Sequence, residues 1–217
     1  MDKNLLIIIG GTFDPIHNGH LRLGVELQLE FPDAEICFMP NACPAHREAP
    51  VASAQLRFDM LKLALSDSEK FGLSDVEIKR QGTSYTVDTL SQLRSDFPER
   101  PIAWVVGSDA YDGLEKWHQV EQLSRLCHLI VASRPGLAIC GHQLDQHGFS
   151  ATENMQDLAV NFSGLVYKAE IPLLDISSTQ IRHLIQTRQQ QKDAVRWLVP
   201  EKVLNFIFEN QLYKSIE

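Results

Sequence analysis

The chain has 217 residues, of which 44% are hydrophobic and 22% are charged. This balance suits one domain spanning residues 1–217 and excludes a disordered or collagen-like chain. Its net charge of -8 argues against a protein that binds nucleic acid or anionic membranes in bulk. No apolar run approaches the roughly 18 residues of a membrane span. The run Leu5–Ile9 lacks the charged upstream region of a signal peptide, so a cytoplasmic location is expected.

Short apolar runs alternate with amphipathic segments along the chain. In chain order we expect a strand at Leu5–Ile9, a helix at His20–Phe31, a strand at Glu35–Met39, a helix at Ala54–Leu65, a strand at Val76–Lys79, a helix at Val87–Phe97, strands at Ile102–Val106, His128–Ala132 and Gly164–Glu170, and helices at Ser178–Thr187 and Glu201–Asn210. Such alternation predicts an α/β fold with a doubly wound, mostly parallel, Rossmann-like sheet and a small C-terminal helical portion.

Three segments need a separate interpretation. The apolar spacing of His20–Phe31 would also permit a strand, but its good helix formers and its length favour a helix. Residues Asn41–Ala52 contain prolines and little periodicity, so we expect a loop just beyond a strand end. The polar segment Pro135–Thr152 is interpreted as a surface excursion without a recognisable motif.

A turn with two glycines and two histidines follows the first predicted strand, in "IIIGGTFDPIHNGH". In parallel sheets ligands lie beyond the carboxyl ends of strands, and a helix beginning at His20 would direct free N–H groups toward a phosphate. The turn is neither a P-loop nor a G-x-G-x-x-G fingerprint, which argues against a dinucleotide-dependent oxidoreductase. His17 and His20 are close enough in sequence to donate to the same phosphate oxygens. Gly10 and Gly11 could instead form only a tight turn, with His20 as a helix cap, and zinc would lack a third nearby ligand.

A second segment, "ISSTQIR" at Ile176–Arg182, has the pattern of a helix start. Ser177 and Gln180 fit a capping box, so N–H groups and serine hydroxyls would be available to a polyphosphate. Arg182 would add a forked positive donor. Alone, this pattern usually indicates only a helix cap. Together with the histidine turn it predicts the far wall of an ATP site.

The segment "GGTFDPIHNGH" resembles the H-x-G-H signature of the nucleotidyltransferase superfamily, and "ISSTQIR" resembles its second signature. Within that superfamily the chain most resembles the bacterial nicotinate-mononucleotide adenylyltransferase family over nearly its full length. The segments "SYTVDTL", "VVGSDAY", "KWHQVEQL", "LIVASRPG" and "VRWLVPEKVLNFI" are similar to that family's landmarks in the same order.

The resemblance implies a role for each matched position. Catalytic contacts with phosphate would be made by His17, His20 and Arg182. ATP would be bound by Gly10, Gly11, Thr12, Phe13, Gly107, Asp109, Ser177 and Ser178. The mononucleotide would be bound by Asn41, His46, Arg47, Thr86, Trp117, His118 and Arg134, with Trp117 stacked on the pyridine ring and backbone N–H groups of Thr86 and His118 on its carboxylate. The family often has Tyr at the position of His118. From the residues alone, Trp117 could be a core aromatic, Asp109 a helix cap, and Arg47 and Arg134 surface charges.

The implied reaction is adenylyl transfer from ATP to the 5′-phosphate of nicotinate mononucleotide, giving nicotinate adenine dinucleotide and pyrophosphate in NAD biosynthesis. Mg²⁺ is expected to accompany ATP without an all-protein cage. The expected partners are these small-molecule substrates, with no nucleic acid and no membrane. Two alternatives stay open: a related adenylyltransferase acting on nicotinamide mononucleotide or phosphopantetheine, and a non-catalytic nucleotide sensor.

Overall fold

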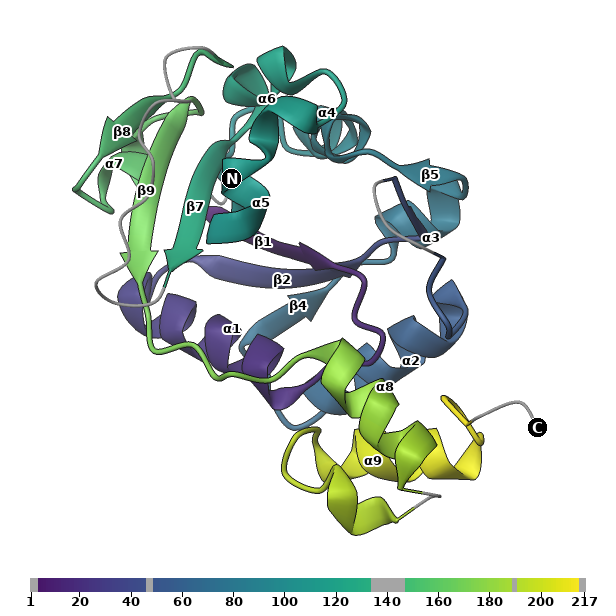
Figure 1. Cartoon of the computed structure of the whole chain (residues 1–217). Coiled ribbons are helices and arrows are strands. Elements are labelled where there is room, and N and C mark those ends of the chain that lie inside the picture. Colours follow the sequence, from purple (N-terminus) through teal and green to yellow (C-terminus); the bar gives the residue numbers. More distant parts are fainter. Residues whose placement is uncertain (1–3, 46–48, 134–146, 189–190, 215–217) are drawn as a thin grey trace.

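The main sheet is parallel throughout the part of the chain that the computed structural model describes, which is residues 4–45, 49–133, 147–188 and 191–214. Its strand order is β4-β2-β1-β6-β7-β9-β8 (Figure 1). The strands are β1 Leu6–Gly11, β2 Glu35–Pro40, β4 Phe71–Leu73, β6 Ile102–Gly107, β7 His128–Ser133, β8 Ser150–Thr152 and β9 Leu165–Glu170. A separate pair consists of β3 Cys43–Pro44 and β5 Thr83–Ser84. The predicted doubly wound fold is confirmed.

Helices cover both faces of this sheet. They are α1 Asn18–Glu30, α2 Ala54–Leu65, α3 Val76–Arg80, α4 Thr86–Asp96, α5 Ser108–Asp112, α6 Val120–Leu126, α7 Asp157–Val160, α8 Ser178–Thr187 and α9 Glu201–Glu209, with short 3-10 turns η1 Leu114–Lys116 and η4 Lys192–Ala194. Figure 1 shows α1 and α2 on one face and α4 and α6 on the other, while α8 and α9 form a helical group beyond α1 and α2. None of the described helices is long and apolar enough to span a membrane.

Strand β1 is buried on both of its faces. Leu6 and Ile8 pack in a cluster with residues of α4 and α6, whereas Ile7 and Ile9 pack in a second cluster with residues of α1, α2, α8 and α9. Alternate side chains of a strand point to opposite faces, so only a nearly unbroken apolar run satisfies both clusters. This explains why the run could be assigned as a central strand from the sequence.

Most predicted elements are confirmed, and two have the predicted bounds: α2 at Ala54–Leu65 and α8 at Ser178–Thr187. Helix α1 is also confirmed, but it begins at Asn18 rather than at His20, because His17 adopts the extended backbone of an N-cap.

The strand predicted at Val76–Lys79 is wrong. These residues lie in α3, and the edge strand is β4, which pairs with Ile36–Phe38 of β2. The side chain of Glu77 is buried and accepts a hydrogen bond from Thr89 Oγ1 (2.7 Å). A four-residue alternation is too short to outweigh this tertiary contact.

The surface excursion predicted at Pro135–Thr152 is only partly correct where the structure describes it, because Ser150 and Ala151 are exposed but belong to a strand. Ser150–Thr152 form β8 beside β9, and Phe149 is buried. Residues 135–146 lie outside the described part. The helices α5, α6 and α7 were not predicted, since each is only four to seven residues long.

The order of the strands reverses at β1. From β1 the chain continues to β2 on one side, and β6 pairs with β1 on the other side. In doubly wound folds such a switch point leaves a crevice at the carboxyl ends of the two strands. The turn after β1 therefore lies where a ligand is expected.

Candidate active site

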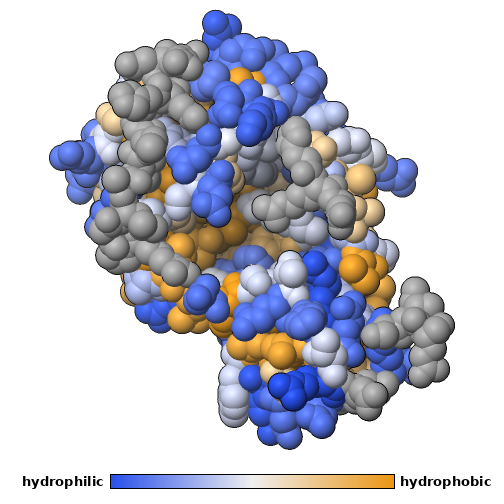
Figure 2. All heavy atoms as spheres, in the orientation of Figure 1, coloured by the Kyte–Doolittle hydropathy of each residue, from blue (hydrophilic) through white to orange (hydrophobic). Residues whose placement is uncertain are grey.

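A cleft of about 1150 Å³ opens at the carboxyl ends of β1 and β6. Figure 2 shows this hollow, with hydrophobic residues on its visible floor. The cleft brings together every predicted site residue that the structure describes, namely Gly10, Gly11, Thr12, Phe13, His17, His20, Asn41, Thr86, Gly107, Asp109, Trp117, His118, Ser177, Ser178 and Arg182. His46, Arg47 and Arg134 lie outside the described residues.

The two glycines that end β1 make room for neighbouring rings. A Cβ atom on Gly10 would lie 2.4 Å from Trp104 Cζ2, and one on Gly11 would lie 2.9 Å from Phe13 Cζ. Both separations are far below van der Waals contact. Glycine is therefore required here to seat aromatic side chains beneath the cleft, a reason that the sequence alone did not reveal.

His17 and His20 form one compact unit at the start of α1. His17 is the N-cap and His20 is the third helical residue, so one turn of helix brings the rings into a stack with centroids 3.6 Å apart. The edge of Phe13 lies against His20, with centroids 5.0 Å apart. The backbone N–H of His17 donates to His20 Nδ1 (3.3 Å), which leaves the proton of a neutral His20 ring on Nε2. The turn thus presents a hydrogen-bond donor rather than a fixed positive charge.

Burial keeps both imidazoles neutral. Burial lowers the pKa of His17 to about 4. Burial, and then repulsion by His17, lower the pKa of His20 well below its usual value. His17 Nδ1 is buried and has no hydrogen-bond partner among the described residues. An unsatisfied buried polar atom costs stability, so the surrounding packing holds this ring in place at the expense of one hydrogen bond.

Gly19 is required by the same stack. Its Cβ would lie 3.0 Å from His17 Nδ1 and 3.6 Å from Ile176 Cβ. A side chain at this position would press on the His17 ring. The H-x-G-H pattern therefore describes a local packing unit as well as a set of polar groups.

The remaining residue of that pattern, Asn18, contacts a distant part of the chain. Its backbone N–H donates to the carbonyl of Leu198 (2.8 Å), and its Nδ2 donates to the carbonyl of Trp197 (2.6 Å). One of the free N–H groups expected at the start of α1 is therefore already used. The segment before α9 caps the helix that carries the two histidines.

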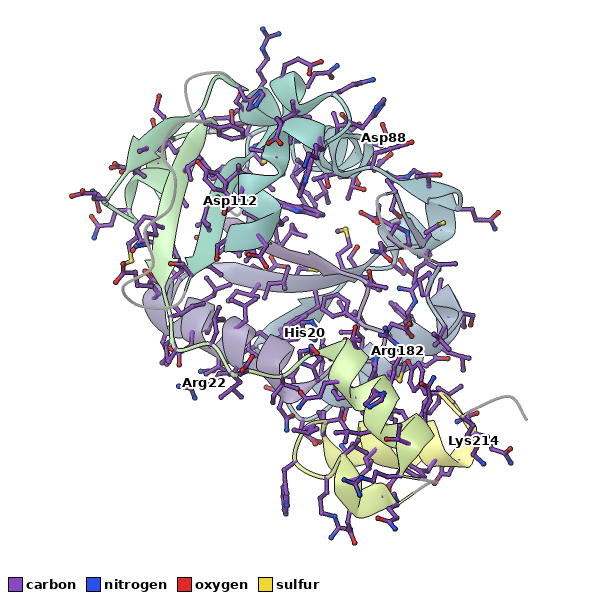
Figure 3. All side chains as sticks on the ribbon, viewed as in Figure 1. His20, Arg22, Asp88, Asp112, Arg182 and Lys214 are labelled. Atoms are coloured by element: carbon purple, nitrogen blue, oxygen red, sulfur yellow. The ribbon has the colours of Figure 1, made fainter. Side chains whose placement is uncertain are left out.

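Helix α8 forms the opposite wall, with Arg182 directed toward the turn after β1 (Figure 3). Ser177 Oγ accepts from the N–H of Gln180 (3.1 Å), which confirms the predicted N-cap. Ser178 Oγ donates to the carbonyl of Pro15 (2.9 Å), so this hydroxyl joins α8 to the turn. Arg182 Nη1 donates to the carbonyl of Asp14 (2.7 Å). The side chain of Arg182 remains 25% exposed, so it can also reach a ligand.

The start of α4 and the segment between η1 and α6 carry three of the predicted mononucleotide residues, Thr86, Trp117 and His118. Trp117 is half-buried, and Thr86 is the first residue of α4. His118 lies against the ring of Tyr85, with centroids 4.4 Å apart. Tyr85 was not predicted as a site residue, although it stands inside the "SYTVDTL" segment. These residues give the cleft an aromatic end, distinct from the polar end at His17 and Arg182.

Two buried charged residues support the cleft from behind. Arg57 of α2 donates to the carbonyls of Thr12 (2.7 Å) and Ala42 (2.9 Å) and to Asn41 Oδ1 (3.3 Å). The Asp14 carboxylate accepts from the backbone N–H groups of Val51 and Ala52 and from the Tyr213 hydroxyl. Asp14 stands in the segment "GGTFDPIHNGH" and could have been predicted as a site residue from that position. Arg57, by contrast, has the sequence context of an ordinary helix surface residue.

A divalent metal would find no ready-made cage here. No group of three or more His, Cys, Asp or Glu side chains with metal-binding geometry occurs among the described residues. Asp109 is an exposed carboxylate on the cleft, whereas Asp14 is buried and occupied by other donors. The donor set fits an ion held mainly by a ligand's own phosphate oxygens and water.

Comparison with known proteins identifies a family profile and several full-length relatives that are similar to this chain. The profile of the cytidylyltransferase-like family matches residues 8–184. A probable nicotinate-nucleotide adenylyltransferase of Hahella chejuensis is 38% identical over 97% of this chain and 96% of its own. The corresponding protein of Yersinia enterocolitica is 37% identical over 98% and 97% of the two chains.

A solved structure has the same fold at much lower identity. The nicotinic acid mononucleotide adenylyltransferase of Plasmodium falciparum, complexed with NaAD, superposes with a TM-score of 0.72 and covers 98% of each chain. Its sequence identity is 19%, so this similarity concerns the fold alone.

Proposed function

Because the chain belongs to the cytidylyltransferase-like family and, within it, to the nicotinate-nucleotide adenylyltransferases, we propose that it transfers the adenylyl group of ATP to nicotinate mononucleotide. The products are nicotinate adenine dinucleotide and pyrophosphate, which places the enzyme in NAD biosynthesis. The observation that carries this proposal is the cleft at the β1/β6 switch point, with the stacked histidines on one wall and Arg182 on the other.

The chemistry requires no protein nucleophile. A 5′-phosphate oxygen of the mononucleotide attacks the α-phosphorus of ATP, a new phosphoanhydride bond forms, and the α–β bridging bond breaks as pyrophosphate leaves. The attacking oxygen is already anionic. The protein therefore acts by aligning the two phosphates and by stabilising charge in the transition state.

In this proposal the polar end of the cleft binds ATP. The Nε2–H of His20 and the ring of His17 donate to α- and β-phosphate oxygens, and Arg182 with the Ser177–Ser178 helix end binds the β- and γ-phosphates. Gly107 and Asp109 face the base or ribose. Two neutral imidazoles suit this role, because they donate hydrogen bonds without repelling each other as two cations would.

The aromatic end binds the acceptor. Trp117 stacks on the pyridine ring, and the N–H groups of Thr86 and His118 bind its carboxylate. Asn41, His46, Arg47 and Arg134 are retained as proposed contacts for the acceptor. Mg²⁺ is proposed to arrive with ATP and to neutralise phosphate charge when bound. A cytoplasmic location and a single domain over residues 1–217 are also part of this proposal.

The test mixes purified protein with Mg²⁺-ATP and one acceptor at a time, following pyrophosphate release and the adenylylated product. The acceptors are nicotinate mononucleotide, nicotinamide mononucleotide and phosphopantetheine. Turnover that is strongest with the nicotinate form supports the proposal. Turnover only with another acceptor would overturn the acceptor assignment, and ATP binding without turnover would favour the nucleotide sensor.

A further inference from the structure

A buried carboxylate connects the C-terminal segment to the cleft. Asp14 is 4% exposed, and Tyr213, near the end of the chain, is 3% exposed. Tyr213 Oη donates to Asp14 Oδ1 (2.8 Å). The same carboxylate accepts from the backbone N–H of Val51 (2.8 Å, to Oδ2) and of Ala52 (3.1 Å, to Oδ1). Three segments that are distant in sequence therefore meet on one side chain.

Arg182 lies next to this carboxylate without pairing closely with it. Its Nη1 is 3.9 Å from Asp14 Oδ2 and donates instead to the Asp14 carbonyl. The nearby guanidinium of Arg57 also interacts electrostatically with Asp14, but it donates its hydrogen bonds to other groups. The guanidinium of Arg182 is thus held between a buried negative charge and the cleft.

The hydrogen bond from Tyr213 influences where Arg182 points. Neutral donors occupy both oxygens of Asp14, so its charge is stabilised without the full involvement of Arg182. Without the Tyr213 hydroxyl, Asp14 Oδ1 would keep only the bond from Ala52. The carboxylate would then attract the guanidinium of Arg182 more strongly, and away from the cleft.

We propose that Tyr213 is a positioning residue, which acts through Asp14 to keep the Arg182 guanidinium directed into the cleft for the phosphates of ATP. This inference rests on the proposed function. It assigns a role at the site to a residue 31 positions beyond Arg182, in the last turn after α9. In Figure 3 the neighbouring Lys214 and Arg182 mark these two parts of the chain.

The test compares two matched tyrosine variants. Tyr213→Phe removes the hydroxyl and keeps the ring. Tyr167→Phe removes a tyrosine hydroxyl that donates to Glu30, another carboxylate, among residues that do not line the cleft. We expect Tyr213→Phe to raise KM for ATP roughly fivefold, while KM for the acceptor stays near its wild-type value. Tyr167→Phe should leave both constants unchanged, although both variants lose a hydrogen bond to a carboxylate and some stability.

A double-mutant cycle tests whether Tyr213 acts through Arg182. In an Arg182→Lys background, adding Tyr213→Phe should change KM for ATP by less than about twofold, because the group that Tyr213 positions is already altered. Additive effects would overturn the inference. So would a Tyr213→Phe variant that is less stable in urea but has wild-type kinetics, since the residue would then be purely structural.

Two further measurements keep the outcome decisive. If the wild-type protein transfers no adenylyl group, the proposed function fails. Calorimetric binding of ATP to the wild type, the two single variants of the cycle and the double variant then still decides the role of Tyr213. If Tyr213→Phe does not fold, the cycle is run with Asp14→Asn, which should also be non-additive with Arg182→Lys. Additivity there would overturn the inference as well.

Discussion

At the scale of single residues, the cleft depends on two histidines that burial keeps neutral. The two rings stack on each other, and burial lowers the pKa of His17 to about 4. Near neutral pH each ring then acts as a hydrogen-bond donor of fixed orientation. This is the kind of preorganised group that can stabilise a transferring phosphoryl centre at little reorganisation cost.

Replacing His20 should affect catalysis much more than folding. In His20→Ala the Nε2–H donor is lost, and we expect kcat to fall by at least about 100-fold. The ring is partly buried, so the loss of unfolding free energy should be about 1 kcal/mol. Steady-state kinetics and urea unfolding of the same preparation provide both values. A variant that loses turnover only in proportion to its unfolded fraction would contradict a catalytic role.

Gly19 provides a test in which activity and helix propensity oppose each other. Alanine stabilises a helix relative to glycine by about 1 kcal/mol, but at this position its Cβ would press on the His17 ring. Gly19→Ala should therefore keep or nearly keep the thermal midpoint and lose roughly tenfold in kcat/KM. The control is Gly72→Ala, where the nearest atom to the added Cβ is Cys37 Sγ at an ordinary 3.5 Å. Equal activity of the two variants would contradict the steric account.

At the scale of elements, helix α1 begins where a distant segment meets it. Leu198 and Trp197 accept both donors of Asn18, so the N-terminus of α1 is capped by tertiary contacts rather than by a local polar side chain alone. This is why the sequence predicted the helix correctly but placed its start two residues late.

Asn18→Ala should loosen this junction without removing a group that lines the cleft. It deletes the Nδ2 bond to Trp197 and keeps the backbone bond to Leu198, so a loss of about 1 kcal/mol is expected. An Asn18→Ala protein that unfolds at the wild-type urea midpoint would show that the bond contributes nothing.

At the scale of the whole molecule, buried histidines make stability depend on pH. Burial lowers the pKa of His17, His20 and also His128, whose Nδ1 accepts from Leu165 N–H (3.1 Å) and whose Nε2 lies 3.0 Å from the Asn161 carbonyl. In the unfolded chain these rings bind protons near pH 6.5. Their contribution is therefore complete above that pH and declines as pH falls from 6.5 toward the folded pKa, which is about 4 for His17.

Urea unfolding at several pH values tests this dependence. The free energy of unfolding should fall below pH 6.5 by up to about 1.4 kcal/mol per pH unit for each excluded proton. In His128→Gln, one titrating group is removed, so the decline between pH 6.5 and 5 should be less steep than in the wild type. If the free energy of unfolding declines equally with pH in the two proteins, protonation of His128 does not contribute to the decline.

Local patterns were sufficient for much of this protein. The unbroken apolar run of β1 indicated a strand buried on both faces, and Ser177 before α8 indicated a cap that the structure contains. Strong periodicity and capping depend on neighbours along the chain, so the sequence alone could determine the α/β alternation, the parallel sheet and the turn that reaches the cleft.

Other features depended on residues that meet only after folding. Neither the helix at Val76–Arg80 nor the buried Arg57 has a local signature, because burial of Glu77 and Arg57 is satisfied by partners from other segments. The link from Tyr213 to Asp14 joins residues 199 positions apart. The sequence by itself determined which chemistry the cleft offers, whereas the tertiary structure decided how each polar group is held, because buried charges are stable only where distant donors and acceptors converge on them.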